Sequence, residues 1–320
     1  MDICLMIEGQ EGVTWDQWVS LARACEEHGY EGLFRSDHYL SFWGPRERGA
    51  LDAWATLAAL GAITERIRLG SMVSPVTFRH PSELAKVVVT ADHASRGRVE
   101  LGMGAGWFEG EHVAFGFSFP PTPERVDRLT EQVEIVHRLM SGDGAVINFE
   151  GEHYRLEACP AFPAPFQDPH PPLIVGGGAG PRSAALAARW ADEYDTVYVS
   201  PAEARERFDS VSAACEAIGR DPASVRHSVL LKVVAGVHEA QVRRRAAEQM
   251  GWQNEEGDVE AYLADLRATG LAGTPDEIVE QLAAYAEAGV QRVLVHQLVH
   301  TDLEAVELIG REVVPAAANV

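Results

Sequence analysis

Lysine, cysteine and long apolar runs are scarce in this sequence, and each scarcity excludes a class of protein. Acidic residues outnumber basic ones by 48 to 27, which gives a formal net charge of −21. A protein that binds nucleic acid or an anionic membrane surface needs clustered Lys and Arg side chains. We therefore expect neither partner, and the acidic balance mainly favours solubility.

The four cysteines are too few and too widely spaced for a disulfide framework or a metal site. They lie at positions 4, 25, 159 and 215 without a Cys-x-x-Cys motif, which is typical of reduced thiols in a cytoplasmic protein. The N-terminus enters an apolar strand with no basic segment, and no apolar run is long enough to span a bilayer. We expect a cytoplasmic protein with no metal, no signal peptide and no membrane span.

Short apolar runs alternate with helical patterns along the 320 residues. Eight strand–helix units in this length are typical of a (β/α)8 barrel, which is the α/β fold that we predict, as one domain over residues 1–320. An open doubly wound sheet is the alternative, but its glycine fingerprint usually follows the first strand. The predicted strands are 3–7, 32–36, 67–73, 98–103, 172–175, 196–199, 228–237 and 293–297.

Two stretches interrupt this alternation and are predicted to be insertions. The first, at about residues 143–172, has a hairpin pattern around Gly151 and then a run of prolines, which does not continue a sheet. The second, at about residues 251–273, contains a predicted helix near residues 259–267. The first is expected to cover one end of the domain.

The C-terminal rim of a barrel carries its functional residues. In this sequence the rim is rich in glycine and hydroxyl side chains. The candidates, in strand order, are Glu8, Ser36 to His38, Ser71 to Pro75, Gly104 to Glu109, Gly176 to Gly178, Ser200, Lys232, and His296 with His300.

Two of these rim segments suggest a specific chemistry. The glycines at 176–178 precede a helix start, where free backbone N–H groups and the helix dipole favour an anion; a plain flexible turn is the alternative. His38 is the best candidate for a catalytic proton donor, because imidazole titrates nearest neutral pH. It could instead be satisfied by Asp37 with no proton role. His296 and His300 are weaker candidates.

Four ordered motifs carry a resemblance to a known family. They are Ser36-Asp37-His38, the stretch from Gly70 to Pro75 with Phe78 to Pro81, the stretch from Gly97 to Trp107, and Pro172 to Gly178. Together they resemble the bacterial luciferase-like flavin monooxygenase superfamily, and more narrowly the branch that uses the deazaflavin coenzyme F420. The resemblance covers nearly the whole chain.

The resemblance implies a bacterial luciferase-like barrel with a cofactor ring at the rim. Asp37 and His38 would lie beside the ring, and Ser71 with Met72 would form a bulge behind it, often with a non-proline cis peptide. Ala105 and Gly106 would line its edge, and the cofactor phosphate would lie on Gly176, Gly177 and Gly178. Trp107 stands where the sugar-phosphate dehydrogenase branch has an acidic glutamate, which argues against sugar phosphates and leaves the proton donor open.

We therefore expect an F420-dependent oxidoreductase that transfers hydride to or from a small organic substrate and works as a homodimer, the commonest oligomer. The alternatives are an FMN-dependent monooxygenase and a noncatalytic flavin-binding relative. A metal-dependent hydrolase ranks below these, since the rim acids do not cluster with histidines.

Overall fold

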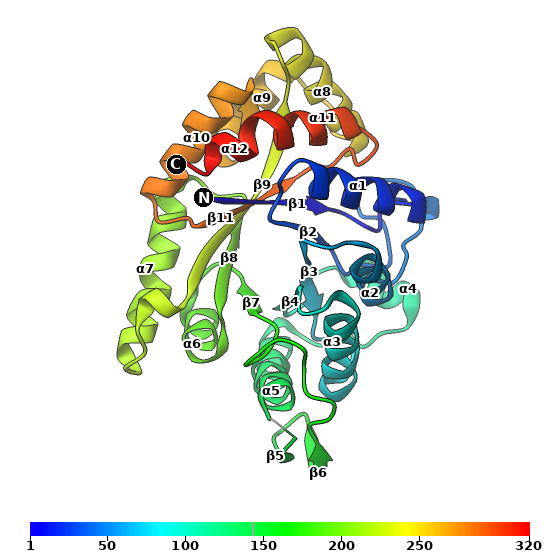
Figure 1. The fold of residues 1–320 in the computed structure, drawn as a ribbon, viewed down its shortest axis with the longest axis vertical. Coiled ribbons are helices and arrows are strands. Elements are labelled where there is room, and N and C mark those ends of the chain that lie inside the picture. The colour runs from blue at the N-terminus through cyan, green and yellow to red at the C-terminus, as the bar shows by residue number, and fades with distance from the viewer. Residues whose placement is uncertain (143) are drawn as a thin grey trace.

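Eight parallel strands form a closed barrel in the computed structural model, which describes residues 1–142 and 144–320. Each strand pairs with the next around the ring, and the last, β11, closes it on β1 (Figure 1). The (β/α)8 prediction is confirmed. The barrel strands are β1 (Asp2–Ile7), β2 (Gly32–Arg35), β3 (Arg68–Pro75), β4 (Val99–Gly104), β7 (Leu173–Gly176), β8 (Glu193–Val197), β9 (Arg226–Ala235) and β11 (Arg292–His296).

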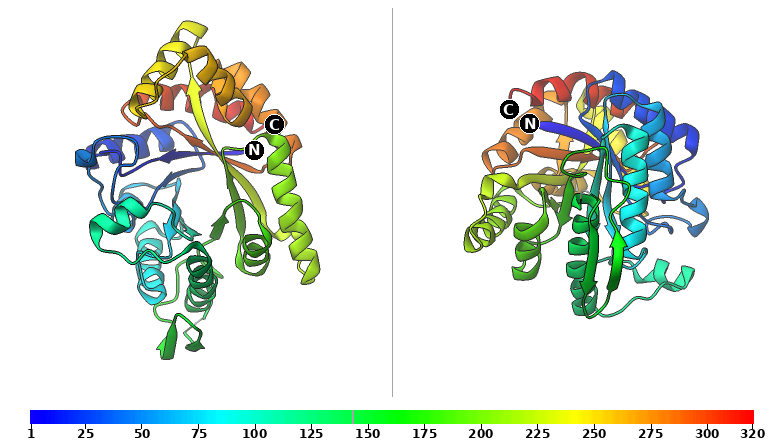
Figure 2. Two further views of the ribbon diagram at one scale, coloured as in Figure 1. Left: turned by 180° about the vertical axis from the view of Figure 1, so that it is seen from behind. Right: turned by 60° about the horizontal axis from the view of Figure 1, so that its bottom comes forward.

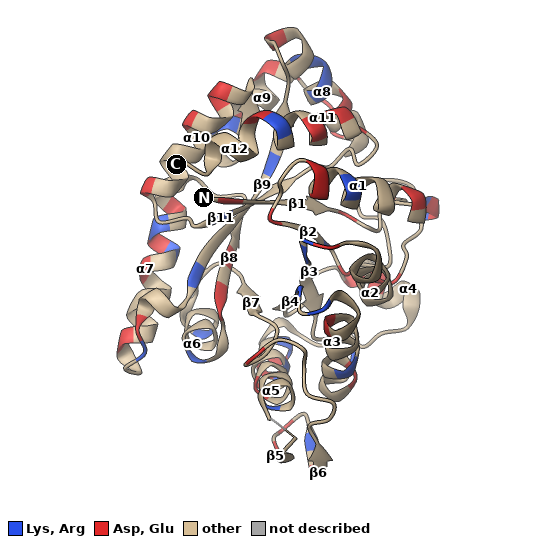
Figure 3. Ribbon diagram, viewed as in Figure 1, with Lys and Arg blue, Asp and Glu red and all other residues tan. Residues whose placement is uncertain are grey.

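Helices surround the barrel, and acidic and basic residues are interspersed along them (Figures 2 and 3). Sequence signals set several of their starts: Thr14 caps the first helix by accepting a hydrogen bond from Gln17 N, and Pro275 follows the cap Thr274. The helices are α1 (Trp15–Glu27), α2 (Ala53–Ile63), α3 (Pro81–Ser95), α4 (Glu109–Phe115), α5 (Thr122–Ser141), α6 (Pro181–Trp190), α7 (Pro201–Ala217), α8 (Glu239–Trp252), α9 (Val259–Thr269), α10 (Pro275–Glu287), α11 (Leu303–Leu308) and α12 (Val314–Ala317).

The first irregular stretch forms the predicted hairpin. Strands β5 (Val146–Glu150) and β6 (Arg155–Pro160) pair antiparallel and project below α5 (Figure 1). Leu156 belongs to the same apolar cluster as Ile135 and Leu139 of α5. Residue 143, where the predicted insertion begins, lies outside the described residues, and the insertion boundaries stay a prediction.

Two strands differ from the sequence prediction. The sixth barrel strand is β8, at Glu193–Val197, and the prediction of 196–199 was late by three residues. Its first half carries Glu193 and Asp195, whose acidic side chains favour a loop in sequence but are buried here. The second stretch holds α9 as predicted and also a short strand, β10 (Leu271–Gly273), which pairs with β9 and was missed.

The barrel interior is filled below the rim. The apolar side chains that fill it are those of Cys4, Met6, Phe34, Met72, Ile174, Leu230 and Leu294. A larger apolar core lies between the strands and the helices. The cavity at the carboxyl ends of the strands therefore lies above this filled layer, where barrels of this class carry their functional residues.

Ion pairs connect strands at the opposite, N-terminal end of the barrel. Glu100 accepts two hydrogen bonds from Arg292, at 2.6 and 3.1 Å, and also pairs with Arg68. Burial would raise the pKa of Glu100, but Arg292 and Arg68 outweigh it and lower the pKa to about 2. The carboxylate therefore ties β4 to two other strands.

Replacing Glu100 with glutamine should lower the free energy of unfolding at pH 7 by about 3 kcal/mol, because Arg292 loses the nearer of its two buried acidic partners, Glu100 at 2.6 Å and Glu193 at 3.1 Å. The depressed pKa of Glu100 means that its stabilisation is complete above pH 4.5 and is lost as the pH falls toward 2. Urea unfolding between pH 7 and pH 3 should show parent and variant converging in acid. The exposed Glu280→Gln is the control; an equal loss in both variants would contradict the assignment.

Candidate active site

A cavity of about 600 Å³ opens at the carboxyl ends of the strands. Its walls come from the barrel strands and from the loops that follow β2, β4, β7 and β8. Of the predicted site residues it is lined by His38, Met72, Ala105, Gly106, Gly176 and Gly177. Its other lining residues include Glu8, Ser36, Phe42, Trp43, Val73, Trp107, Asp195, Tyr198 and Lys232.

The end of β3 departs from regular strand geometry, as predicted, and forms the cavity floor. The peptide between Met72 and Val73 is cis, and the pairing of β3 with β4 shifts register between Ser71 and Ser74. The cis bond is thus one residue beyond Ser71-Met72. Met72 and Val73 line the cavity, while the buried Ser71 hydroxyl donates to Gly102 O and lies behind it.

Two glycines of β4 make room for this bulge. A Cβ at Gly102 would lie 2.2 Å from Ser71 O, and one at Gly104 would lie 2.5 Å from Val73 Cγ2. Both distances are below any real contact, so a side chain at either position would displace the bulge. The Gly-x-Gly pattern is therefore required by strand packing against the bulge.

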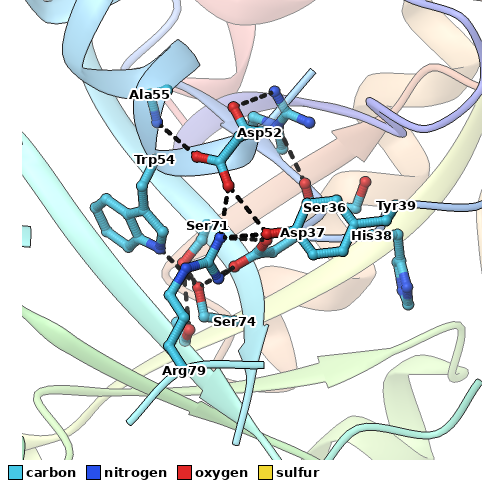
Figure 4. Close-up of polar contacts among 12 residues, drawn as sticks. Ser36, Asp37, His38, Tyr39, Asp52, Trp54, Ala55, Ser71, Ser74 and Arg79 are labelled. Carbon is cyan, nitrogen blue, oxygen red and sulfur yellow. Dashed lines mark hydrogen bonds and ion pairs between the residues drawn. The ribbon is translucent and has the colours of Figure 1, made fainter. Parts of the chain in front are cut away.

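Asp37 does not line the cavity, contrary to the prediction that it lies beside the ring. Its carboxylate forms an ion pair with Arg79 and accepts a hydrogen bond of 2.8 Å from Ser74, on the far side of the bulge (Figure 4). Trp54 donates to Ser74 and Arg79 also binds Asp52. The buried carboxylate of Asp37 therefore holds the bulge from behind through Arg79 and Ser74. Asp37 makes no hydrogen bond to His38, which pairs with Glu111 instead.

His38 points away from this cluster and into the cavity (Figure 4). Its Nδ1 lies 2.7 Å from Glu111 Oε1, and the second Glu111 oxygen accepts from Tyr39 N at 3.0 Å. Burial alone would lower the pKa of His38, but the hydrogen bond and charge of Glu111, with Glu8 and Asp37, raise it. A raised pKa favours the protonated imidazole at neutral pH, which is the form that can donate a proton.

Glu111 was missed by the sequence analysis, which considered Glu109. Glu109 is exposed in the first turn of α4, whereas Glu111, two residues later, is buried. Only the two-residue spacing on a short helix after β4 distinguishes them, and that spacing places them on different faces. The fold was needed to show which acid meets His38.

Aromatic side chains form the mouth of the cavity. Trp107 is 60% exposed and packs edge-on against Phe42 at 5.1 Å and His38 at 5.7 Å. Trp43 packs on Phe42 from the other side. A mouth built this way favours an apolar substrate over a charged one.

A second polar group lies at the cavity and begins at Glu8, after the strand that pairs with β2. Glu8 Oε1 lies 3.1 Å from His296 Nε2, and His296 Nδ1 lies 2.5 Å from the hydroxyl of Tyr198. Burial would raise the pKa of Glu8, but His296, His38 and Gln10 lower it to about 2. His300 is not part of this group: it is buried beside Trp252, and burial lowers its pKa to about 4.

The glycine turn after β7 leads from the cavity to the start of α6. Gly176 and Gly177 line the cavity, whereas Gly178 is exposed beyond it. The Tyr194 hydroxyl holds the turn, donating to Gly177 O and accepting from Ala179 N, both at 2.6 Å. A Cβ at Gly178 would meet nothing within 4 Å. The open space beside a helix N-terminus fits a phosphate group.

Metal and membrane features can be stated for the described residues. Within residues 1–142 and 144–320, no group of three His, Cys, Asp or Glu side chains is arranged to hold a metal ion. No helix of the same residues is long and apolar enough to cross a membrane.

Comparisons with known proteins agree with this geometry. The profile of the luciferase-like monooxygenase family matches residues 3–292, so the chain belongs to this family. It is 30% identical over 311 residues to an F420-dependent glucose-6-phosphate dehydrogenase of Microbacterium testaceum, covering 91% of this chain and 90% of that one. It is 31% identical over 244 residues to an F420-dependent hydroxymycolic acid dehydrogenase of Mycobacterium tuberculosis, covering 74% and 64%.

A solved structure shows the same fold. An F420-dependent secondary alcohol dehydrogenase, in complex with an F420-acetone adduct, superposes with a TM-score of 0.80 at 21% identity, covering 99% of this chain and 98% of that one. At this identity the likeness concerns the barrel, and the chemistry has to be argued from the residues.

Replacing Glu111 with glutamine should lower the pKa of His38, because the hydrogen bond is kept in part while the negative charge that favours imidazolium is removed. The pKa can be followed by NMR titration of the His38 ring protons in the parent and in the variant. Glu109→Gln, on the exposed first turn of α4, is the matched control. If both variants titrated like the parent, the pairing would be wrong.

Proposed function

We propose that this protein is a coenzyme F420-dependent oxidoreductase with the deazaflavin ring in the cavity and its phosphate on the glycine turn. The observation that carries the proposal is the continuous path from the bulge at Met72 and Val73 to the turn at Gly176 and Gly177, which one cavity joins. Dehydrogenases named as F420-dependent are among the relatives that match most of this chain.

The residues that line the cavity would play different roles toward a flat ring. Met72 and Val73 would support one face, and the small Ala105 and Gly106 would lie at its edge. A bound deazaflavin supplies hydride transfer, so the protein has to hold the ring and place protons where charge develops. His38 would donate a proton to the ring, and its contact with Glu111 at Nδ1 supports this role.

The substrate that this cavity favours is a small organic molecule with an apolar body. Its mouth is formed by Phe42, Trp43 and Trp107. Among the described residues that line the cavity, Lys232 is the one lysine or arginine. Lys232 donates to Gln253 Oε1 at 2.8 Å, and burial lowers its pKa. A single committed lysine offers little to a sugar phosphate. We also infer a cytoplasmic homodimer, by the composition and the usual frequency of dimers.

Coenzyme F420 should bind more tightly than FMN. Both carry a phosphate for the glycine turn and a tricyclic ring for the cavity, so the difference rests on the family relatives and is expected to be modest. Absorbance titrations of the purified protein with the two cofactors, side by side, measure it. Tight FMN binding with no response to F420 would replace the proposal with an FMN-dependent monooxygenase, and no binding of either would leave a noncatalytic relative.

Replacing Gly177 with valine should weaken F420 binding, because its φ of +153° is unfavourable for a side chain and a Cβ would stand at the phosphate approach. His38→Ala should act in the opposite sense, lowering turnover about 10²-fold with saturating cofactor while affinity changes less. Gly219→Val is the control: Gly219 follows α7 and also has a positive φ, so this variant measures the conformational strain of valine at such a position away from the rim. Parent-like affinity in Gly177→Val would remove the turn from the cofactor site.

A further inference from the structure

An ion pair and a hydrogen bond connect three side chains at the cavity, from Glu8, after the strand that pairs with β2, to Tyr198, across the ring of strands from β2. These contacts run from Glu8, after β1, through His296, at the end of β11, to Tyr198, after β8. His296 is fully buried, and Glu8 and Tyr198 both line the cavity. A carboxylate, an imidazole and a hydroxyl in this order form the arrangement by which proteins activate a hydroxyl group.

Tyr198 is held so that its ring faces the cavity. It has a φ of +51°, which is uncommon for a residue with a side chain, and such positions cluster at functional sites. The ring lies parallel to that of His296, with centroids 5.9 Å apart, and Lys232 Nζ lies 5.4 Å from its centre. The tyrosine is therefore fixed on one side and open to the cavity on the other.

The direction of the hydrogen bonds follows from the charges. Glu8 has a pKa of about 2, so it is ionised at neutral pH and favours an N–H on the Nε2 of His296 that faces it. His296 Nδ1 is then left as an acceptor for the Tyr198 hydroxyl, whose pKa burial raises well above its ordinary value. The remaining lone pairs of the Tyr198 oxygen are free for a ligand in the cavity.

We propose that Tyr198 is a catalytic residue that exchanges the proton of the substrate's own oxygen, with His296 and Glu8 as its positioning residues, and that the substrate is a secondary alcohol or ketone with an apolar body. This assignment rests on the proposed function. The site then has two groups that transfer protons: His38 exchanges a proton with the ring, and Tyr198 exchanges one with the substrate oxygen. Tyr198 is thus a proton donor to the substrate, a role that the side chain of Trp107 cannot perform.

The proton transfers balance in both directions. In oxidation, the alcohol O–H proton passes to the Tyr198 oxygen while the Tyr198 proton passes to His296 Nδ1, and Glu8 stabilises the resulting imidazolium. The carbinol C–H bond breaks and its electron pair leaves with the hydrogen to the deazaflavin, so the alcohol is oxidised to the carbonyl and the deazaflavin is reduced. Ketone reduction reverses each transfer, and no further reagent is needed.

Other titratable groups surround Tyr198 and could affect its pH behaviour. They come from every element packed against it: Glu8, His38, Asp195, Lys232, Glu255, Tyr262, Asp265 and His296. Because so many groups contribute, a pH profile alone would not identify the relay. A comparison of matched variants at one pH does so.

The test uses the protein loaded with F420 and three apolar secondary alcohols, cyclohexanol, 1-phenylethanol and 2-octanol, and follows the loss of deazaflavin absorbance. Tyr198→Phe should lower kcat about 10²-fold, while KM and F420 affinity stay within about twofold, because only the hydroxyl is lost. Tyr285→Phe is the control. Its hydroxyl donates to Val199 O, next to Tyr198, and is buried away from the cavity.

A double-variant cycle tests whether the three residues act together. His296→Gln should also lower kcat. The double variant Tyr198→Phe with His296→Gln should be no slower than the slower single variant, because residues that act as one unit lose their joint effect when either is replaced. Where His296→Gln does not fold, Glu8→Gln takes its place. Independent, multiplying losses would overturn the relay.

The outcomes separate the two proposals. A parent protein that fails to bind F420 would remove the proposed function. A parent that binds F420 but reduces it with none of the three alcohols would leave that function standing and overturn the role of Tyr198. Parent-like turnover in Tyr198→Phe, or an equal loss in Tyr285→Phe, would overturn it as well.

Discussion

The close packing of β3 on β4 beneath the cavity is the constraint on which the rest of the site depends. The bulge at Met72 and Val73 occupies space that a side chain at Gly102 or Gly104 would need. The buried pair of Asp37 and Arg79 holds the bulge from the opposite side. With glycine in front and an ion pair behind, the bulge has one position, and a flat surface suited to a ring results.

The barrel and much of its rim could be predicted from the sequence, because apolar periodicity and glycine spacing are local signals. Residues that act through distant partners could not. Asp37 matches the family motif, yet its charge is committed to Arg79, 42 residues away. Glu111 meets His38 across 73 residues, and Tyr198 meets His296 across 98. Such pairings exist only after the barrel closes, so composition and spacing carry no sign of them. The sixth strand was misplaced for a related reason, since buried acids resemble a loop until their position inside the barrel is known.

The site thus has two polar sides and an apolar entrance. His38 faces the cavity from the end of β2 and is held by Glu111 of α4, while Glu8 and His296 follow the neighbouring strands β1 and β11 and lead to Tyr198, across the ring of strands from β2. Both histidines are oriented by a carboxylate at one nitrogen, which leaves the other nitrogen for proton exchange. The aromatic rings of Phe42, Trp43 and Trp107 pack on one another at the entrance.

The most direct test of this account is a crystal structure of the protein grown with coenzyme F420. The account predicts the ring against Met72 and Val73, with Ala105 and Gly106 at its edge, and the phosphate within hydrogen-bonding distance of the backbone N–H of Gly178, since the N–H of Gly177 donates to Asp195 O. It also predicts open space between the ring, His38 and Tyr198 for a substrate. A ring bound outside the cavity, a phosphate bound away from the glycine turn, or a ring that fills the space between His38 and Tyr198 would contradict the account.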